Sequence, residues 1–265
     1  MTDTPTEVVH LTVTDGIATL TLDSPRNRNA LGSALVEQLA AGLAAASADP
    51  AARAVVLTHT GGTFCAGADL TEALARGASI AEASAAGTQA MIALMRAIVE
   101  LPKPVIARVD GHVRAGGLGL VGACDIALAG AASSFAVTEA RLALAPSVIS
   151  MVLLPKLTAR SAGRYFLTGE RFDAPVAEQI GLITRACADP ADLDRTLADM
   201  LAGIRLASPQ GLAASKALTT AALLATFDAD ADARAAESAA LFASDEAREG
   251  MTAFLGKRPA AWVSQ

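Results

Sequence analysis

Two segments of small residues, each at the end of an apolar, strand-like run, constrain this chain more than any other feature. The first is Thr63-Phe64-Cys65-Ala66-Gly67-Ala68-Asp69-Leu70, and the second is Ala115-Gly116-Gly117-Leu118-Gly119. Because alanine and glycine have little or no side chain, a ligand can approach the backbone N–H groups there. Two N–H groups that point at one oxygen form an oxyanion hole, which stabilises negative charge on a carbonyl or thioester oxygen. The sequence therefore predicts a fold in which the two segments meet.

The composition limits the classes of protein to which the chain can belong. Only 3% of its 265 residues are aromatic although 52% are hydrophobic, so the core must consist mainly of Ala, Val, Leu and Ile. A net charge of -6 argues against binding to nucleic acid or to an anionic membrane surface. Cys65, Cys124 and Cys187 form no CxxC pair and have no His at ligand spacing, which indicates packed thiols and no metal site. With no signal sequence and no apolar run of about 18 residues, we expect a soluble, cytoplasmic protein.

The order of the apolar patterns predicts an α/β fold. Residues 8–13 and 17–22 alternate as strands around the turn Thr14-Asp15-Gly16, and Ser33 is expected to cap a helix. Asp69 and Glu72 resemble a capping box, residues 72–88 are weakly specified, and helix is expected to resume near Ala90. Further strands are expected at 53–58, 104–109, 125–129 and 134–137, and helices after Pro146 and from about Ser161 onward. Without a polar linker, we expect one core over residues 1–200 and a C-terminal helical region over residues 201–265.

At this point the residues resemble a known family, the crotonase superfamily of enoyl-CoA hydratases and isomerases. The segments that carry the resemblance, in chain order, are residues 22–31 (LDSPRNRNAL), FCAGADL at 64–70, KPVIA at 103–107, AGG at 115–117, ACD at 123–125, Phe135 with Glu139, LTGE at 167–170, and EGMTAF at 249–254. The resemblance implies a ββα spiral core with a C-terminal helical region used for trimer formation. It also implies homotrimers, often paired into hexamers, that act on an acyl-CoA thioester without a separate cofactor.

The resemblance also implies which residues are catalytic. The two oxyanion donors fall on the backbone N–H groups of Ala68 and Gly116, and Glu139 matches the acid/base carboxylate. Near Phe135 and Leu142, burial should favour the protonated form of Glu139 and bring its pKa into the working range. The alternative is a solvated surface glutamate paired with Arg141.

One departure from the family pattern leaves the reaction open. The best-known hydratases have a second glutamate where this chain has Gly119. Two carboxylates usually hold the water that is added, whereas moving a proton along one acyl chain needs a single carboxylate. Gly119 therefore favours isomerisation. Residues 144–150 and 164–167 instead resemble bacterial hydratases of branched-chain acyl-CoA, including methylglutaconyl-CoA hydratase types, so we expect a hydratase, with a Δ3,Δ2-enoyl-CoA isomerase as the alternative.

The resemblance assigns further residues to the acyl-CoA substrate. Arg26, Arg28 and Asn29 border the CoA entrance, Lys257 of a neighbouring subunit reaches the phosphates, and Phe254 closes the pantetheine channel. The Ser147 N–H helps to hold the water. The substrate-binding residues expected beside these are Ala66, Gly67, Asp69, Leu70, Gly117 and Pro146. For the charged residues, ordinary solvated charge is nearly as good an interpretation of each one alone, and Arg114 beside the second segment is expected to face solvent.

Three other functions fit the sequence less well. Gly117-Leu118-Gly119-Leu120-Val121-Gly122 spells G-x-G-x-x-G, as in NAD-dependent dehydrogenases, but that interpretation leaves the first segment unexplained. A non-catalytic acyl-CoA-binding protein would account for the missing carboxylate, although Glu139 argues against it. A serine hydrolase lacks G-x-S-x-G, and His10, His59 and His112 have no evident partner serine.

Overall fold

The fold contains two β-sheets. At three points along the chain, a strand of the first sheet is followed after a short turn by a strand of the second sheet. The computed structural model describes residues 6–69, 71–72 and 80–263. The first sheet contains β1 (Val9–Thr14), β2 (Ile17–Leu22), β3 (Ala54–His59), β5 (Val105–Val109), β7 (Ile126–Ala129) and β10 (Arg185–Ala186). The second contains β4 (Thr63–Cys65), β6 (His112–Arg114), β8 (Ser134–Ala136) and β9 (Phe172–Asp173).

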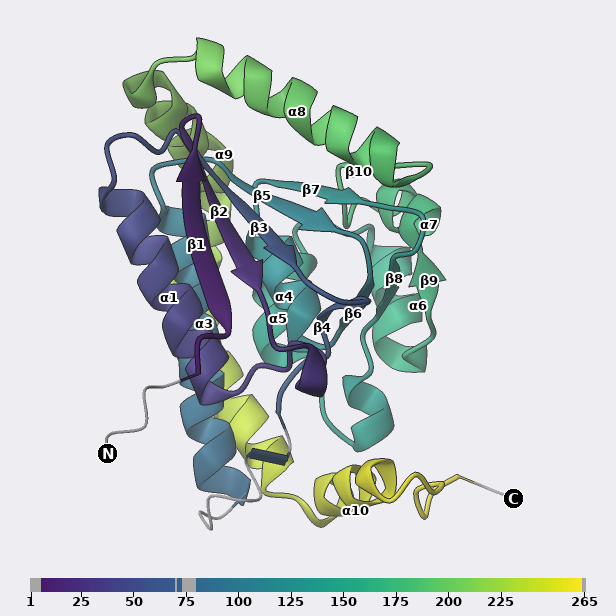
Figure 1. Cartoon of the computed structure of the whole chain (residues 1–265). Helices are drawn as coiled ribbons and strands as arrows, with labels where there is room; N and C mark the ends of the chain where they lie inside the picture. Colours follow the sequence, from purple (N-terminus) through teal and green to yellow (C-terminus); the bar gives the residue numbers. More distant parts are fainter. Residues whose placement is uncertain (1–5, 70, 73–79, 264–265) are drawn as a thin grey trace.

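The order of the strands gives the chain the course of a spiral. The first sheet has the order β1-β2-β3-β5-β7-β10 and the second β4-β6-β8-β9. The chain passes from β3 to β4, from β5 to β6 and from β7 to β8, so that each pair crosses between the sheets (Figure 1). The pairs β1–β2 and β8–β9 are antiparallel, and all the other described pairs are parallel. The carboxyl ends of β4, β6 and β8 therefore lie at one edge of the second sheet.

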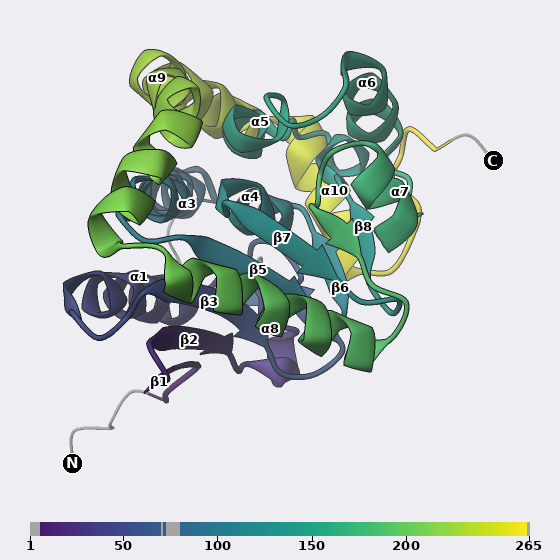
Figure 2. The same cartoon turned by 90° about the horizontal axis from the view of Figure 1, so that it is seen from above.

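Helices cover both faces of the first sheet. They are α1 (Ser33–Ala48), α3 (Ile80–Glu100), α4 (Gly116–Ala123), α5 (Ser147–Leu153), α6 (Ala159–Thr168), α7 (Ala174–Gln179), α8 (Pro190–Leu206), α9 (Pro209–Phe242) and α10 (Asp245–Leu255), with short 3-10 turns η1 (Pro25–Asn27) and η2 (Glu139–Leu142). Figure 2 shows α8 on one face, α3 and α4 on the other, and α9 outside them. Successive strand residues point to opposite faces, so Val55 and Leu57 pack in the main core, whereas Ala54 and Val56 pack toward α8. Burial on both faces explains why these strands are apolar throughout rather than alternating.

A buried ion pair joins the long helix α9 to this core. Nζ of Lys216 lies 2.8 Å from Oδ2 of Asp125 and donates to the carbonyl oxygens of Ile98 (2.9 Å) and Lys103 (3.1 Å). The same Asp125 oxygen accepts a hydrogen bond from the backbone N–H of Val105 at 2.7 Å. The KPVIA and ACD segments are therefore joined by an interaction that holds the fold together.

The structure confirms the α/β fold and the opening hairpin, and it corrects several details. The helix expected near Ala90 begins at Ile80, and β4, β6, β9 and β10 were not anticipated because strands of two or three residues leave no periodic pattern. Gly32, not Ser33, is the N-cap of α1. Residue 200, where the core was expected to give way to the C-terminal helical region, falls inside α8, whose buried Leu193 and Leu201 pack against the first sheet.

Asp69 caps the turn that follows the first small-residue segment, but it does not form a full capping box. Its Oδ1 accepts hydrogen bonds from the N–H groups of Thr71 (3.1 Å) and Glu72 (3.0 Å). The Glu72 carboxylate reaches the N–H and hydroxyl of Ser33 in the described structure, which ties the turn to the start of α1.

Candidate active site

Three segments meet at the edge where the parallel strands β4, β6 and β8 end. β4 leads into Ala66-Gly67-Ala68, β6 leads into Ala115-Gly116, and β8 leads into η2, which begins at Glu139. The register pairs Arg114 with Ala136, and Ala115 N donates to the Ala136 carbonyl at 3.2 Å. Because the strands are parallel neighbours, the chain leaves all three at the same edge of the sheet. The fold thus brings together segments that lie far apart in the sequence.

The two small-residue segments touch each other, as the sequence predicts. A Cβ atom placed on Gly67 would lie 2.9 Å from the Cβ of Ala115 and 3.7 Å from the backbone nitrogen of Gly116. Gly67 has a φ of 91° and Ala115 one of 46°, both in the left-handed region. For the non-glycine residue, such a conformation typically costs about 1–3 kcal/mol, which is common at functional sites.

The backbone around Ala68 turns its N–H away from Leu31. Leu31 N donates to the Gly67 carbonyl at 2.8 Å, and the Leu31 carbonyl accepts from Asp69 N at 3.5 Å. In a parallel bridge of this kind, the N–H and C=O of the residue in between point away from the partner strand. Neither Ala68 N–H nor Gly116 N–H has a protein acceptor among the described residues. Two unpartnered donors at one place are what an oxyanion hole requires.

The G-x-G-x-x-G sequence lies inside helix α4 and not in a loop before a helix. A Cβ on Gly117 would lie 2.8 Å from the Cβ of Cys65, so Gly117, which was expected among the substrate-binding residues, is buried against β4. Gly122 approaches α5 in the same way. These glycines allow close packing between elements, which removes the structural basis for a dinucleotide-binding loop.

The position of the missing second carboxylate has no room for one. A Cβ on Gly119 would lie 2.7 Å from Cγ2 of Ile149, and 2.9 Å from both Cε of Met91 and Sδ of Met95. Three apolar side chains from α3 and α5 thus occupy the space. A side chain as large as glutamate would therefore clash at this position.

Glu139 is held in an environment that favours its neutral form. Its Oε2 atom is enclosed and has no hydrogen-bond partner in the described part of the chain. Burial raises the pKa of the Glu139 carboxyl to about 7, against the opposing effect of hydrogen bonds from the backbone of Glu139 and Thr138. Arg141, the alternative ion-pair partner, donates instead to the carbonyl of Thr168. The carboxyl can therefore both accept and release a proton near neutral pH.

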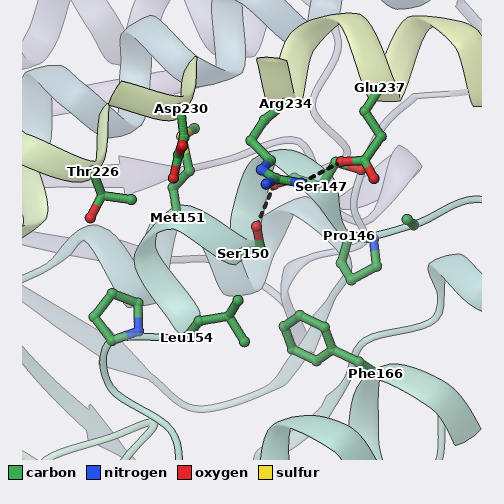
Figure 3. A pocket seen from close by; sticks show the side chains of 12 residues that line it. Pro146, Ser147, Ser150, Met151, Leu154, Phe166, Thr226, Asp230, Arg234 and Glu237 are labelled. Carbon is green, nitrogen blue, oxygen red and sulfur yellow. Dashed lines mark hydrogen bonds and ion pairs between the residues drawn. The ribbon is translucent and has the colours of Figure 1, made fainter. Parts of the chain in front are cut away.

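Ser147 is the first residue of α5, and its side-chain oxygen is enclosed in the same way as Oε2 of Glu139. The residue is 5% exposed, and its Oγ has no partner among the described residues. Pro146 and Ser147 line one end of a pocket of about 310 Å³ between α5, α6 and α9. Figure 3 shows Thr226, Asp230, Arg234 and Glu237 on the α9 side of this pocket.

The α9 residues of the pocket were not anticipated from the sequence. Thr226, Asp230 and Arg234 recur at intervals of four, and Arg234 forms an ion pair with Glu237 at 2.8 Å. Polar residues at this spacing lie on one face of a helix, and this was the available signal. A solvated helix face has the same pattern, so it does not single out a pocket.

The residues expected at the CoA entrance divide into two groups. Arg26 and Arg28 are exposed, and the Arg28 carbonyl accepts a hydrogen bond from Ala66 N at 3.1 Å, which places Arg28 beside the first segment. Phe254 and Lys257 are exposed at the end of α10, which packs on η2 where Gly250 approaches the backbone of Leu142.

Asn29 is the one buried member of this set. It is 0% exposed, and its amide bonds to Ser24 N (2.6 Å) and to the carbonyl of Thr63 (2.8 Å). Asn29 therefore fixes the local backbone and cannot contact CoA through its side chain. Asp69 accepts a hydrogen bond from Asn27 at 3.0 Å in addition to its capping bonds. Leu70 lies outside the described residues.

The remaining polar candidates lie away from this edge or have other partners. Arg114 does not extend into solvent as expected, because its guanidinium donates to the carbonyls of Val113 and Ser134 and to the Ser134 hydroxyl. His112 does have a serine neighbour, with Nδ1 2.9 Å from Oγ of Ser134. Both lie on the side of β6 opposite the buried Val113. The pair is thus turned away from the core.

The three cysteines are buried and His59 is partly buried, and none of the four has an evident catalytic arrangement. Burial raises the pKa of the Cys65 and Cys124 thiols to about 12, and all three cysteines are free. Nε2 of His59 accepts a hydrogen bond from Asp110 N at 3.0 Å, and burial lowers the pKa of this imidazole.

In the ranges that the structure describes, no cluster of three or more potential metal-ligating side chains is found, and no helix has the length and apolar character needed to cross a bilayer.

Comparison with known proteins gives one consistent result along nearly the whole chain. The model of the family described as Enoyl-CoA hydratase/isomerase matches residues 12–265. The crystal structure of an enoyl-CoA hydratase from Mycobacterium avium is 58% identical and has a TM-score of 0.89, covering 97% of this chain and 99% of that one. The 2,3-dehydroadipyl-CoA hydratase of Escherichia coli is 33% identical over 90% of this chain and 92% of its own. An enoyl-CoA hydratase of Alternaria alternata is 30% identical over 93% of this chain and 81% of its own.

Proposed function

This chain belongs to the enoyl-CoA hydratase/isomerase family, and we propose that it is an enoyl-CoA hydratase, which adds water across the 2,3 double bond of an enoyl-CoA thioester. The observation that carries the proposal is the contact between the two segments that hold the unpartnered N–H groups of Ala68 and Gly116, at the strand ends from which Glu139 also emerges. Such donors suit a thioester oxygen, and a carboxyl with a pKa of about 7 suits proton transfer to and from carbon.

The proposed reaction uses Glu139 twice. As its carboxylate takes a proton from water, the water oxygen bonds to C3, and the electrons of the double bond move onto the thioester oxygen. The N–H groups of Ala68 and Gly116 stabilise this enolate, and loss of one such donor typically costs about 3 kcal/mol of barrier. Glu139 then returns the proton to C2 as the thioester carbonyl re-forms. The net change is the addition of one water molecule.

A Δ3,Δ2-enoyl-CoA isomerase is the second candidate, and the apolar surroundings of Gly119 favour it. Ile149, Met91 and Met95 exclude a second carboxylate there. In the isomerase, Glu139 would take a proton from C2 and deliver it to C4, with the same oxyanion hole holding the dienolate. This proton shuttle needs no water held in place and therefore no second polar group.

We also infer how the CoA portion of the substrate is held. Arg26 and Arg28 are exposed beside the first segment, and guanidinium groups bind phosphate well. Phe254, at the end of α10, is 57% exposed and is not part of the hydrophobic core. We propose that its ring covers the pantetheine arm of the substrate. We propose that Lys257 reaches the phosphates of a neighbouring subunit in a homotrimer or hexamer.

A panel of thioesters distinguishes the two reactions. The purified protein is mixed with crotonyl-CoA, 3-methylglutaconyl-CoA and a 3-enoyl-CoA while the ultraviolet absorbance of the conjugated enoyl thioester is followed. We expect loss of that absorbance with a 2-enoyl substrate, because hydration removes the double bond. A gain of absorbance with the 3-enoyl substrate alone would indicate isomerisation, and no change with any of them would leave an acyl-CoA-binding protein.

A further inference from the structure

We propose that the Ser147 hydroxyl is a second polar group of the catalytic centre and holds the reacting water together with the Glu139 carboxylate. This inference rests on the proposed hydratase function. The starting observation is that three side-chain polar atoms in the described part of the chain are enclosed without a hydrogen-bond partner: Nε of Arg53, Oε2 of Glu139 and Oγ of Ser147. Unsatisfied buried polar groups are uncommon in folded proteins and call for an explanation. Two of these three belong to the segment from Glu139 to Ser147.

The packing of two helices puts Ser147 at the level of an oxyanion donor. Gly119 of α4 faces Ile149 of α5, and one turn later Gly122 faces Leu153 and Val152. The residue offset is 30 or 31 in these contacts, so the helices run side by side in the same direction. One turn back, the same offsets bring Pro146 and Ser147 alongside the start of α4 at Gly116.

The direction of the side chain and the path of the chain support the same placement. In a helix, the Cα–Cβ bond tilts toward the N-terminus, so the Ser147 side chain leans toward the end of α5 where α4 also begins. The chain reaches Ser147 directly from Glu139, and Leu144 N donates back to the Glu139 carbonyl at 3.0 Å. Ser147 and Glu139 thus lie at the same end of the site as Gly116.

The chemistry of a hydroxyl suits the vacant role. Hydration needs a water molecule oriented toward C3, and the apolar contacts around Gly119 exclude the carboxylate that would hold it there. A serine hydroxyl can accept one hydrogen of water while Glu139 accepts the other. Only the proton bound toward Glu139 is transferred, so Ser147 keeps its own proton and acts by orientation. Isomerisation and exchange of the α-proton need no such water.

The test compares two activities of the Ser147→Ala variant. Hydration of crotonyl-CoA should fall about 10- to 100-fold in kcat with little change in KM, as expected for loss of an orienting group. Exchange of the α-proton of butyryl-CoA in D2O, measured by NMR, should stay within about twofold, because it needs only Glu139 and the oxyanion hole. Ser133→Ala is the matched control, since Ser133 is also buried but donates to the carbonyl of Val109 at 3.2 Å and should leave both activities unchanged.

Thermal unfolding separates this role from a structural one. Removing a buried hydroxyl that has no protein partner should raise Tm by about 2 °C, whereas loss of a structural hydrogen bond would lower it. Equal hydration by Ser147→Ala and the unchanged protein would overturn the proposal. So would a parallel loss of hydration and exchange, because that result assigns Ser147 to the scaffold. If the unchanged protein exchanges the α-proton but hydrates nothing, the proposed hydratase function itself fails.

Discussion

Glu139 has a proton affinity suited to work near neutral pH, and its cause is local. Enclosure of Oε2 without an ion-pair partner raises the pKa of the carboxyl to about 7, whereas Arg141, its neighbour in the chain, binds elsewhere. Desolvation penalises the charged form of an acid, so the shift upward has the expected sign.

This pKa predicts how hydration depends on pH. The carboxylate form must accept the proton of water, so activity requires the deprotonated residue in the free enzyme. Plotted against pH, kcat/KM should rise about tenfold per pH unit below about 6, bend near 7 and level off above 8. Steady-state hydration of crotonyl-CoA between pH 5 and 9 measures the curve. A profile that stays flat down to pH 5 would show that Glu139 has an ordinary pKa or is not the base.

Several residue roles could be predicted from the sequence, and others could not. Glu139, Ala68 and Gly116 were assigned through the family resemblance, and the structure brings their segments together. The burial of Asn29 was not predicted, because a polar residue next to an arginine gives no sign that backbone groups enclose it. The enclosed Ser147 hydroxyl and the α9 side of the pocket depend on how distant helices pack, which no local pattern records.

At the scale of elements, the second sheet does most to position the site. Its parallel strands β4, β6 and β8 end at one edge and release three segments there. The strand order follows from repeated crossings between the two sheets. Strands as short as β6 have no recognisable sequence pattern, so the sequence does not reveal these crossings. The sequence therefore predicted β1, β2, β3, β5, β7 and β8 but not the short strands β4, β6, β9 and β10, and the family resemblance implied only a spiral core.

The contact between the β4 and β6 loops predicts the effect of a single methyl group. In Gly67→Ala, the new Cβ would lie 2.9 Å from Ala115 and 3.7 Å from Gly116 N, at a φ of 91° that alanine adopts reluctantly. The donors should move apart, and hydration should fall at least about 100-fold, as when an oxyanion donor is lost.

Gly62→Ala provides the control for this change. It lies in the same β3–β4 connection, has no positive φ, and a Cβ there would meet no atom within 4 Å. Its kcat should match that of the unchanged protein. Full activity in Gly67→Ala would contradict the convergence of the two segments.

At the scale of the whole molecule, one buried ion pair connects α9 with α3 and the first sheet. Lys216→Met should leave the Asp125 carboxylate without its cation and lower the free energy of unfolding by about 3–5 kcal/mol. Urea unfolding followed by circular dichroism measures this change. Arg96→Met, which removes solvent-exposed ion pairs with Glu100 of α3 and Asp228 of α9, should cost less than about 2 kcal/mol. Equal effects of the two substitutions would contradict the structural role of Lys216.

The proposed assembly also belongs to this scale. If α10 presents Phe254 and Lys257 to a neighbouring subunit, the protein should be a homotrimer or hexamer in solution. Light scattering after size-exclusion chromatography should give three or six times the mass of the chain. A monomer with full hydratase activity would remove the neighbouring-subunit role of Lys257.

The most direct test of the account is the turnover of crotonyl-CoA by Glu139→Gln. Glutamine keeps the size of the side chain but cannot take a proton from water, so kcat should fall by about 1000-fold or more. The affinity for CoA, measured by calorimetry, should stay within about threefold because Glu139 contacts only the reacting acyl group in the proposed mechanism. Glu170→Gln, which alters a partly exposed carboxylate paired with Arg164, is the matched control and should hydrate normally. Unchanged turnover by Glu139→Gln would contradict the account.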